Sequence, residues 1–177
     1  MMKLEEKLTA IKKFQISSFK PCKTLGFYAD TANVIFSIII EMRDIVNAAE
    51  QQDTILLHKR MGICASSIAN YATVNSLKLI DALRNYDYGE LEQATEGYDL
   101  EDYLKKIKDD LSFFRDMKES EKIQFIQKCW ISVFPDEYHD DFIKVERILN
   151  NTIEDLKIKS PSFFIQAEPK ATKYGLE

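Results

Sequence analysis

Residues that form tight turns are scarce in this sequence. Its 177 residues include five glycines and four prolines, fewer than a protein built from many β-hairpins needs. The glycines are also isolated, so the chain contains no G-x-G-x-x-G, G-x-x-x-x-G-K or G-x-S-x-G motif. The composition therefore argues against an all-β fold and excludes a glycine-rich phosphate-binding loop.

Cysteines are also few, and they are widely spaced. Cys22, Cys64 and Cys129 are odd in number and form no C-x-x-C pair, which argues against a disulfide framework or a cysteine-rich zinc site. Free thiols are typical of reducing compartments, so we expect a cytoplasmic protein, in its own cell or in a host cell. Cys22 lies between Lys20 and Lys23, whose charges would favour a reactive thiolate; an incidental loop cysteine is the alternative.

No apolar run is long enough to cross a membrane. The longest, VIFSIII at 34–40, is followed at once by Glu41, Arg43 and Asp44, whereas a membrane-spanning helix needs roughly 20 apolar residues. Residues 1–14 mix charged and apolar side chains, which is not the pattern of a secretory signal. We therefore expect no membrane span.

Apolar residues recur at three- and four-residue steps over most of the chain, as in amphipathic helices. The ranges with this pattern are 2–15, 29–52, 55–86, 100–118, a short stretch from 120, and 136–157. Gly62 is a point at which the range 55–86 could divide in two. We predict an all-α, single-domain bundle of about five or six helices.

Within this bundle the helix at 29–52 is expected to be central, because it is apolar nearly all the way round. The helix at 55–86 has unusually small side chains between Gly62 and Ala72. Small side chains allow two helix backbones to lie close together, so we expect a neighbouring helix to approach there.

The chain divides into a helical domain and a short irregular end. The helical patterns fill residues 1–160, and the last helix ends at Ser160-Pro161. Residues 161–177 show no such pattern. We expect this tail to dock on the bundle through Phe163, Phe164 and Ile165.

Acidic residues gather in one segment of a chain whose formal net charge is −5, a balance that argues against nucleic-acid binding. Residues 87–102 hold seven acids and no base, with tyrosines among them. Tyrosine supplies contact area at low entropic cost, so the mixture suits a surface for a basic protein partner. The residues assigned to this acidic surface are Tyr88, Glu90, Glu92, Glu96, Tyr98, Asp99 and Asp102. The alternative is a solvated connection whose tyrosines pack inward.

The segment FPDEYHDDF at 134–142 places four carboxylates around one of the two histidines. A helix that begins at Pro135 and Asp136 explains it, since acids are favoured near the positive end of the helix dipole. A metal site is the alternative. His139-Asp140 resembles the metal-binding doublet of the all-helical HD-domain phosphohydrolases, in this dipeptide alone. The other candidate ligands are Glu41, Asp44 and His58.

No constellation in the sequence identifies a catalytic centre, and none implies a cofactor. We therefore expect a non-catalytic protein-binding regulator or inhibitor, for example a phage inhibitor, an immunity protein or an effector. The alternative is a small all-helical metal-dependent phosphohydrolase that uses the carboxylate and His-Asp residues named above.

Overall fold

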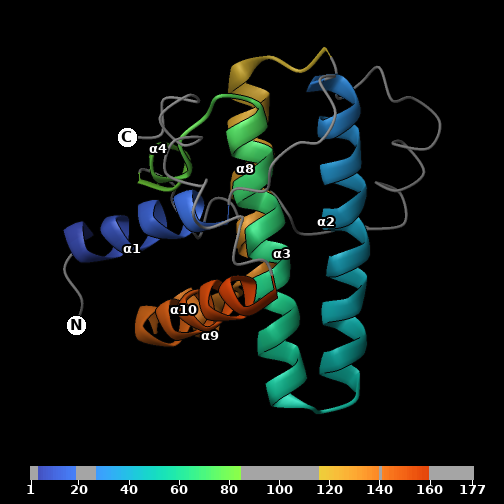
Figure 1. The fold of residues 1–177 in the computed structure, drawn as a ribbon, viewed down its shortest axis with the longest axis vertical. Coiled ribbons are helices and arrows are strands. Elements are labelled where there is room, and N and C mark those ends of the chain that lie inside the picture. Colours follow the sequence, from blue (N-terminus) through green and yellow to red (C-terminus); the bar gives the residue numbers. More distant parts are fainter. Residues whose placement is uncertain (1–3, 19–26, 85–115, 140, 160–177) are drawn as a thin grey trace.

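The computed structural model describes residues 4–18, 27–84, 116–139 and 141–159 (Figure 1). These ranges contain helices and no strand, which confirms the predicted all-α bundle. The helices are α1 (Leu4–Ser17), α2 (Phe27–Glu50), α3 (Thr54–Val74), α4 (Leu79–Arg84), α8 (Glu119–Val133), α9 (Asp136–His139) and α10 (Phe142–Lys159). None of these described helices combines the length and the apolar character that crossing a bilayer requires. The predicted helix at 100–118 and the tail at 161–177, with Phe163, Phe164 and Ile165, lie outside the described residues.

The two longest of the described helices, α2 and α3, form an antiparallel pair (Figure 1). Their connection is short because Gln52 has a left-handed backbone conformation, with a φ of 57°. Asp53 then caps the start of α3. Its carboxylate accepts a hydrogen bond of 3.0 Å from the backbone N–H of Leu56, which satisfies one of the amides that a helix start leaves free.

The central helix of the bundle is α3, not α2 as the sequence pattern suggested. Every residue of α3 from Cys64 to Val74 is buried, and α3 contacts α1, α2, α8 and α10. Figure 1 shows α2 on one side of α3, with α1, α4 and α10 on the other. In contrast, α2 leaves Phe36, Ile40 and Val46 exposed by 38%, 57% and 51%. Apolar character all round α2 did not make it central, because the small side chains of α3 admit more neighbours.

A close approach to α3 occurs at Gly62, where α10 packs. A methyl group at this position would overlap Thr152 Oγ1 and would lie 3.4 Å from Ile148 Cγ2. The Thr152 hydroxyl donates to the Ile148 carbonyl at 2.9 Å, so it is satisfied within its own helix. The prediction that small side chains admit a neighbouring helix is confirmed, and Gly62 does not divide α3.

The helix predicted at 55–86 is instead divided at 75–78, which separates α3 from α4. The side-chain amide of Asn75 donates to the carbonyl of Tyr71 at 2.8 Å. Ser76 follows with a left-handed φ of 57°. These two residues turn the chain out of the helix without any glycine or proline.

Gln15 on α1 supports this break from outside. The residue is 3% exposed, and its amide oxygen accepts from the backbone N–H of Leu79 at 2.8 Å. Its Nε2 donates to the carbonyl of Leu77 at 2.9 Å and lies 3.2 Å from Thr73 Oγ1. Backbone groups that the break frees are thus satisfied by a side chain about 60 positions away in sequence.

The helix predicted at 136–157 is also divided, into α9 and α10. Asp141 begins the second of them, since its Oδ1 accepts from the backbone N–H of Lys144 at 3.3 Å. Pro135 and Asp136 do begin a helix, but it is a single turn. One acid of FPDEYHDDF therefore caps a second helix rather than lying in the first turn of a continuous one.

Candidate functional site

The acidic surface predicted from the sequence lies outside the described residues. All seven members fall within 85–115: Tyr88, Glu90, Glu92, Glu96, Tyr98, Asp99 and Asp102. Cys22, the candidate reactive thiol, lies outside the described residues as well. The roles assigned to these residues remain predictions.

The acid pair on α2, suggested as part of a metal site, has other neighbours in the fold. Glu41 accepts a hydrogen bond of 3.0 Å from Ser67 Oγ on α3. Asp44 forms an ion pair with Arg60, with 3.6 Å between Oδ2 and Nη1. Both acids therefore help to join α2 to α3.

His58 is the one candidate metal ligand that the fold brings to the FPDEYHDDF segment. Its Nε2 lies 3.1 Å from the hydroxyl of Tyr138. The side chain of His139 and the whole of Asp140 lie outside the described residues. Among the residues that are described, no group of three or more histidines, cysteines, aspartates and glutamates could hold a metal ion.

Cys64 and Cys129 are buried in the core of the bundle. Burial raises the pKa of both thiols well above the usual range, and the negative charge of Glu41 raises that of Cys64 further. The thiolate is the reactive form of cysteine. These two enclosed, protonated thiols therefore contribute packing rather than nucleophilic chemistry.

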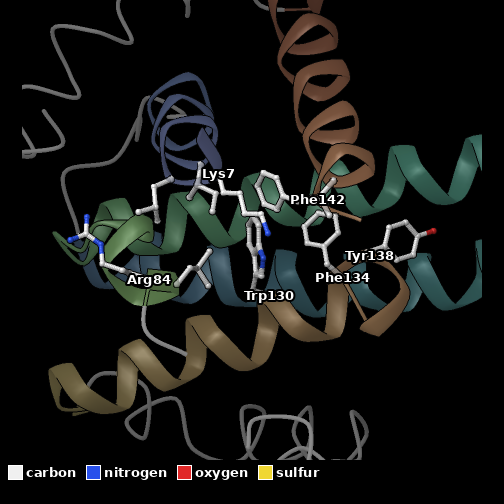
Figure 2. A pocket seen from close by; sticks show the side chains of 10 residues that line it. Lys7, Arg84, Trp130, Phe134, Tyr138 and Phe142 are labelled. Atoms are coloured by element: carbon white, nitrogen blue, oxygen red, sulfur yellow. The ribbon is translucent and has the colours of Figure 1, made fainter. Parts of the chain in front are cut away.

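An aromatic pocket lies between α1, α4, α8, α9 and α10, and the sequence interpretation missed it (Figure 2). It encloses about 160 Å³. Four aromatic side chains form one wall, aliphatic side chains from α1, α4 and α10 complete the cavity, and two cations reach it. The aromatic residues are Trp130, Phe134, Tyr138 and Phe142, and the cations are Lys7 and Arg84. We call this cavity the aromatic pocket.

The aromatic wall follows a strict four-residue repeat from Trp130 to Phe142. The ring centroids of Trp130 and Phe134 lie 4.9 Å apart, and those of Phe134 and Tyr138 lie 6.4 Å apart. Both separations fall in the range that aromatic pairs favour. The repeat crosses the breaks between α8, α9 and α10, so the rings reach one pocket from three helices. This spacing is the sequence signal that could have revealed the site.

Two lysines lie against aromatic rings of the pocket, and Arg84 belongs to its lining. Lys7 Nζ lies 5.5 Å from the centroid of the Phe142 ring, and Lys144 Nζ lies 4.6 Å from that of Tyr138. Figure 2 shows Lys7 reaching across the pocket, while the guanidinium of Arg84 points away from the rings. Within the described residues, none of these three cations forms an ion pair with a carboxylate.

Tyr138 joins the aromatic pocket to His58. Its ring lines the pocket, and Figure 2 shows its hydroxyl pointing away from the other rings. The two rings pack edge to face, with 5.8 Å between centroids. Burial lowers the pKa of His58 and Lys144 lowers it further, while Glu137 raises it and Arg147 lowers it to smaller extents. Burial also raises the pKa of Tyr138, so both groups are uncharged at neutral pH.

The size of the aromatic pocket limits what it can hold. A cavity of about 150 Å³ takes up one benzene ring, whereas pockets for drug-sized ligands measure roughly 300–1,000 Å³. At about 160 Å³ the pocket accommodates one apolar side chain or one ring, and is too small for a nucleotide. Apart from Lys7 and Tyr138, its described lining has no side chain that serves in acid–base or nucleophilic chemistry. The arrangement is therefore suited to binding.

Two wider hollows are lined mainly by polar side chains. One of about 380 Å³ lies between α3 and α10 beside His58 and Asp155. Another of about 750 Å³ lies between α1 and α10 beside Glu5 and Glu146. Binding pockets are typically apolar with a few convergent polar groups, so the aromatic pocket is the stronger candidate despite its smaller volume.

Comparisons with known proteins add no relative to this picture. The chain matches no protein-family model, and neither a search of curated proteins nor a search of solved structures found a match. The geometry of the described residues is therefore the basis for a functional assignment.

Proposed function

We propose that the protein is a non-catalytic regulator or inhibitor that binds a partner protein, and that one apolar side chain of this partner enters the aromatic pocket. The observation that carries the proposal is the pocket itself, an apolar cavity of about 160 Å³ with an aromatic wall. Energy at protein interfaces is concentrated where a single anchor residue fills a desolvated pocket. A cavity of this size and lining matches such an anchor.

The walls of the aromatic pocket belong to the packed core, which supports a binding role. Trp130 is 4% exposed and Phe134 is 2% exposed. Beside them, Gln127 Nε2 on α8 donates to the carbonyl of Ala82 on α4 at 2.8 Å. This bond ties together two helices that line the pocket. A preformed cavity binds at a lower cost in conformational entropy than one that must be assembled.

The acidic surface at 88–102 remains part of the proposal as a second contact, one for a basic region of the partner. The two contacts make different predictions. Binding through the acidic surface depends on charge and weakens as salt is added, whereas binding through the aromatic pocket depends on whether its cavity is open.

A pull-down from the native cell, made with four forms of the protein, tests the aromatic pocket. Phe142→Trp enlarges a half-buried side chain at the rim and is expected to abolish partner recovery. Phe36→Trp makes the same exchange on the exposed face of α2 and is the matched control, which should recover the partner normally. The wild type and a charge-reversed protein complete the set, the latter altered at Glu90, Glu92, Glu96 and Asp99.

The outcome separates the two surfaces. Full recovery by a folded Phe142→Trp protein, with a melting temperature near that of the wild type, would show that the aromatic pocket is not the binding site. Loss of the partner in the charge-reversed protein alone would assign binding to the acidic surface instead. Loss in both proteins would indicate that the partner uses both contacts.

A further inference from the structure

Lys7 places a positive charge at the mouth of the aromatic pocket. Its Nζ lies 5.5 Å from the centroid of the Phe142 ring, and Figure 2 shows the side chain extending toward Trp130. The residue is half-buried and has no carboxylate within ion-pair distance in the described part of the chain. An ammonium group that has exchanged part of its hydration for an aromatic face still attracts an anion.

Two further cations lie nearby: Arg84 belongs to the lining of the pocket, whereas Lys144 packs on the ring of Tyr138 and is not part of that lining. Lys144 Nζ is 4.6 Å from the centroid of Tyr138, and Arg84 is exposed at the end of α4. Lys144 lies in the first turn of α10, where the helix dipole disfavours positive charge, so helix stability does not explain its position. Glu137 provides a negative charge on the Tyr138 side, whereas Lys7 lies on the side of Phe142. The described lining of the pocket therefore carries two cations, Lys7 and Arg84, and no carboxylate, on a chain whose net charge is −5.

We infer that the aromatic pocket recognises an acidic peptide segment of the partner, in which an apolar anchor residue fills the cavity and a nearby aspartate or glutamate pairs with Lys7. This inference rests on the proposed function and narrows it. Successive residues of an extended peptide are about 3.3 Å apart and their side chains point to opposite faces, so the acidic side chain that faces Lys7 belongs to a residue two positions from the anchor, about 6.6 Å along the peptide. A charge pair at such a rim contributes mainly to specificity and to the rate of association.

Trp130 supplies the readout for a test with defined peptides. It is the single tryptophan of the chain and part of the aromatic wall, so occupation of the cavity should change its emission. The probes are three pentapeptides with capped ends: Glu-Gly-Phe-Gly-Glu, Gln-Gly-Phe-Gly-Gln and Glu-Gly-Ala-Gly-Glu. We expect the first to bind about three- to fivefold more tightly than the second, and the third to leave the emission unchanged.

Substitution of Lys7 tests whether its charge causes the difference in affinity between the glutamate and glutamine peptides. Lys7→Met removes the ammonium and keeps most of the side-chain length, so the difference between the glutamate and glutamine peptides should disappear. The glutamine peptide should bind this variant as it binds the wild type. Lys59→Met removes an exposed lysine of α3 and should preserve the difference. Added salt should reduce the difference in the wild type.

The outcomes separate this inference from the proposed function. Equal affinities for the glutamate and glutamine peptides, or a difference that persists in Lys7→Met, would show that no acidic residue of the partner pairs with Lys7. Either result would leave the pocket proposal intact. An unchanged Trp130 emission with both phenylalanine peptides at millimolar concentration would count against the pocket itself. If 3-phenylpropanoate binds as tightly as the first peptide, the ligand is a small carboxylate rather than a peptide segment.

Discussion

Gln15→Leu is expected to lower the free energy of unfolding, because two backbone groups lose their hydrogen-bond partners at once. The leucine retains most of the buried volume but removes the amide that holds the break between α3 and α4. The backbone N–H of Leu79 loses its acceptor at 2.8 Å and the carbonyl of Leu77 its donor at 2.9 Å. Leu79 is fully buried, so water cannot replace the lost partner.

The structure sets the magnitude of this loss. A buried amide left unpaired costs about 1–3 kcal/mol. The Leu77 carbonyl is only part-buried, so water relieves some of its loss, and roughly 1 kcal/mol is added. We expect the free energy of unfolding to fall by about 2–4 kcal/mol, a large share of the 5–15 kcal/mol that is typical of a domain. Urea unfolding followed by Trp130 emission measures it.

Two further variants show whether the hydrogen bonds of Gln15 are the cause. Gln127→Leu makes the same exchange at a part-buried site with one bond to Ala82, so it should cost only about 1 kcal/mol. Gln15→Glu can accept from Leu79 but can donate to Leu77 only when protonated. A carboxyl buried at this position is expected to have a raised pKa, so the stability of Gln15→Glu relative to the wild type should improve as the pH falls. A cost for Gln15→Leu no larger than that for Gln127→Leu would refute the reasoning.

Three other predictions concern packing, pH and surface charge. Gly62→Ala places a methyl group against Thr152 and should lower the free energy of unfolding by about 1–3 kcal/mol; Thr152→Ala should recover part of this loss, and strictly additive losses would contradict the contact. Because the pKa of His58 is lowered in the fold, mainly by burial, the native state binds fewer protons than the unfolded chain once the pH falls below 6.5. Stability should therefore decrease with falling pH from that point, and an equally steep decrease in His58→Asn would rule out this histidine. Asp44→Asn breaks an exposed ion pair of 3.6 Å with Arg60 and should change stability by less than about 1 kcal/mol; thermal melts that show a larger loss would mean that the pair is more than a surface contact.

The fold class was predictable because it depends on a periodicity that short windows of sequence contain. Which helix is most deeply buried was not predictable. The run 34–40 is apolar on every side, yet Phe36 and Ile40 on α2 are exposed. What makes α3 central is the absence of bulk at positions such as Gly62, where α10 approaches. Apolar content indicates which residues can be buried. The distance at which neighbouring helices pack decides which of these residues are buried.

The helix breaks escaped prediction for a related reason. No proline or glycine lies between Val74 and Leu79, and the helical spacing of apolar residues continues across this stretch. The groups that the break exposes are satisfied by Gln15, which is 64 positions from Leu79 in the chain. A prediction from neighbouring residues includes Leu79 but not Gln15, and it therefore gives one uninterrupted helix.

The candidate site shows the same division between local and distant information. In FPDEYHDDF the charged residues are candidates for metal ligands or helix caps. For Asp141 the local explanation is sufficient, because this residue caps α10. The aromatic members have no local explanation. Tyr138 and Phe142 reach a cavity with Trp130 on one side and α1 on the other, while the Tyr138 hydroxyl meets His58, 80 positions away. The charge of Asp141 is accounted for by the adjacent backbone, whereas an apolar cavity exists only where distant helices meet. The four-residue aromatic repeat is present in the sequence, but only the packing of α1 against α4 and α10 turns that repeat into the wall of a pocket.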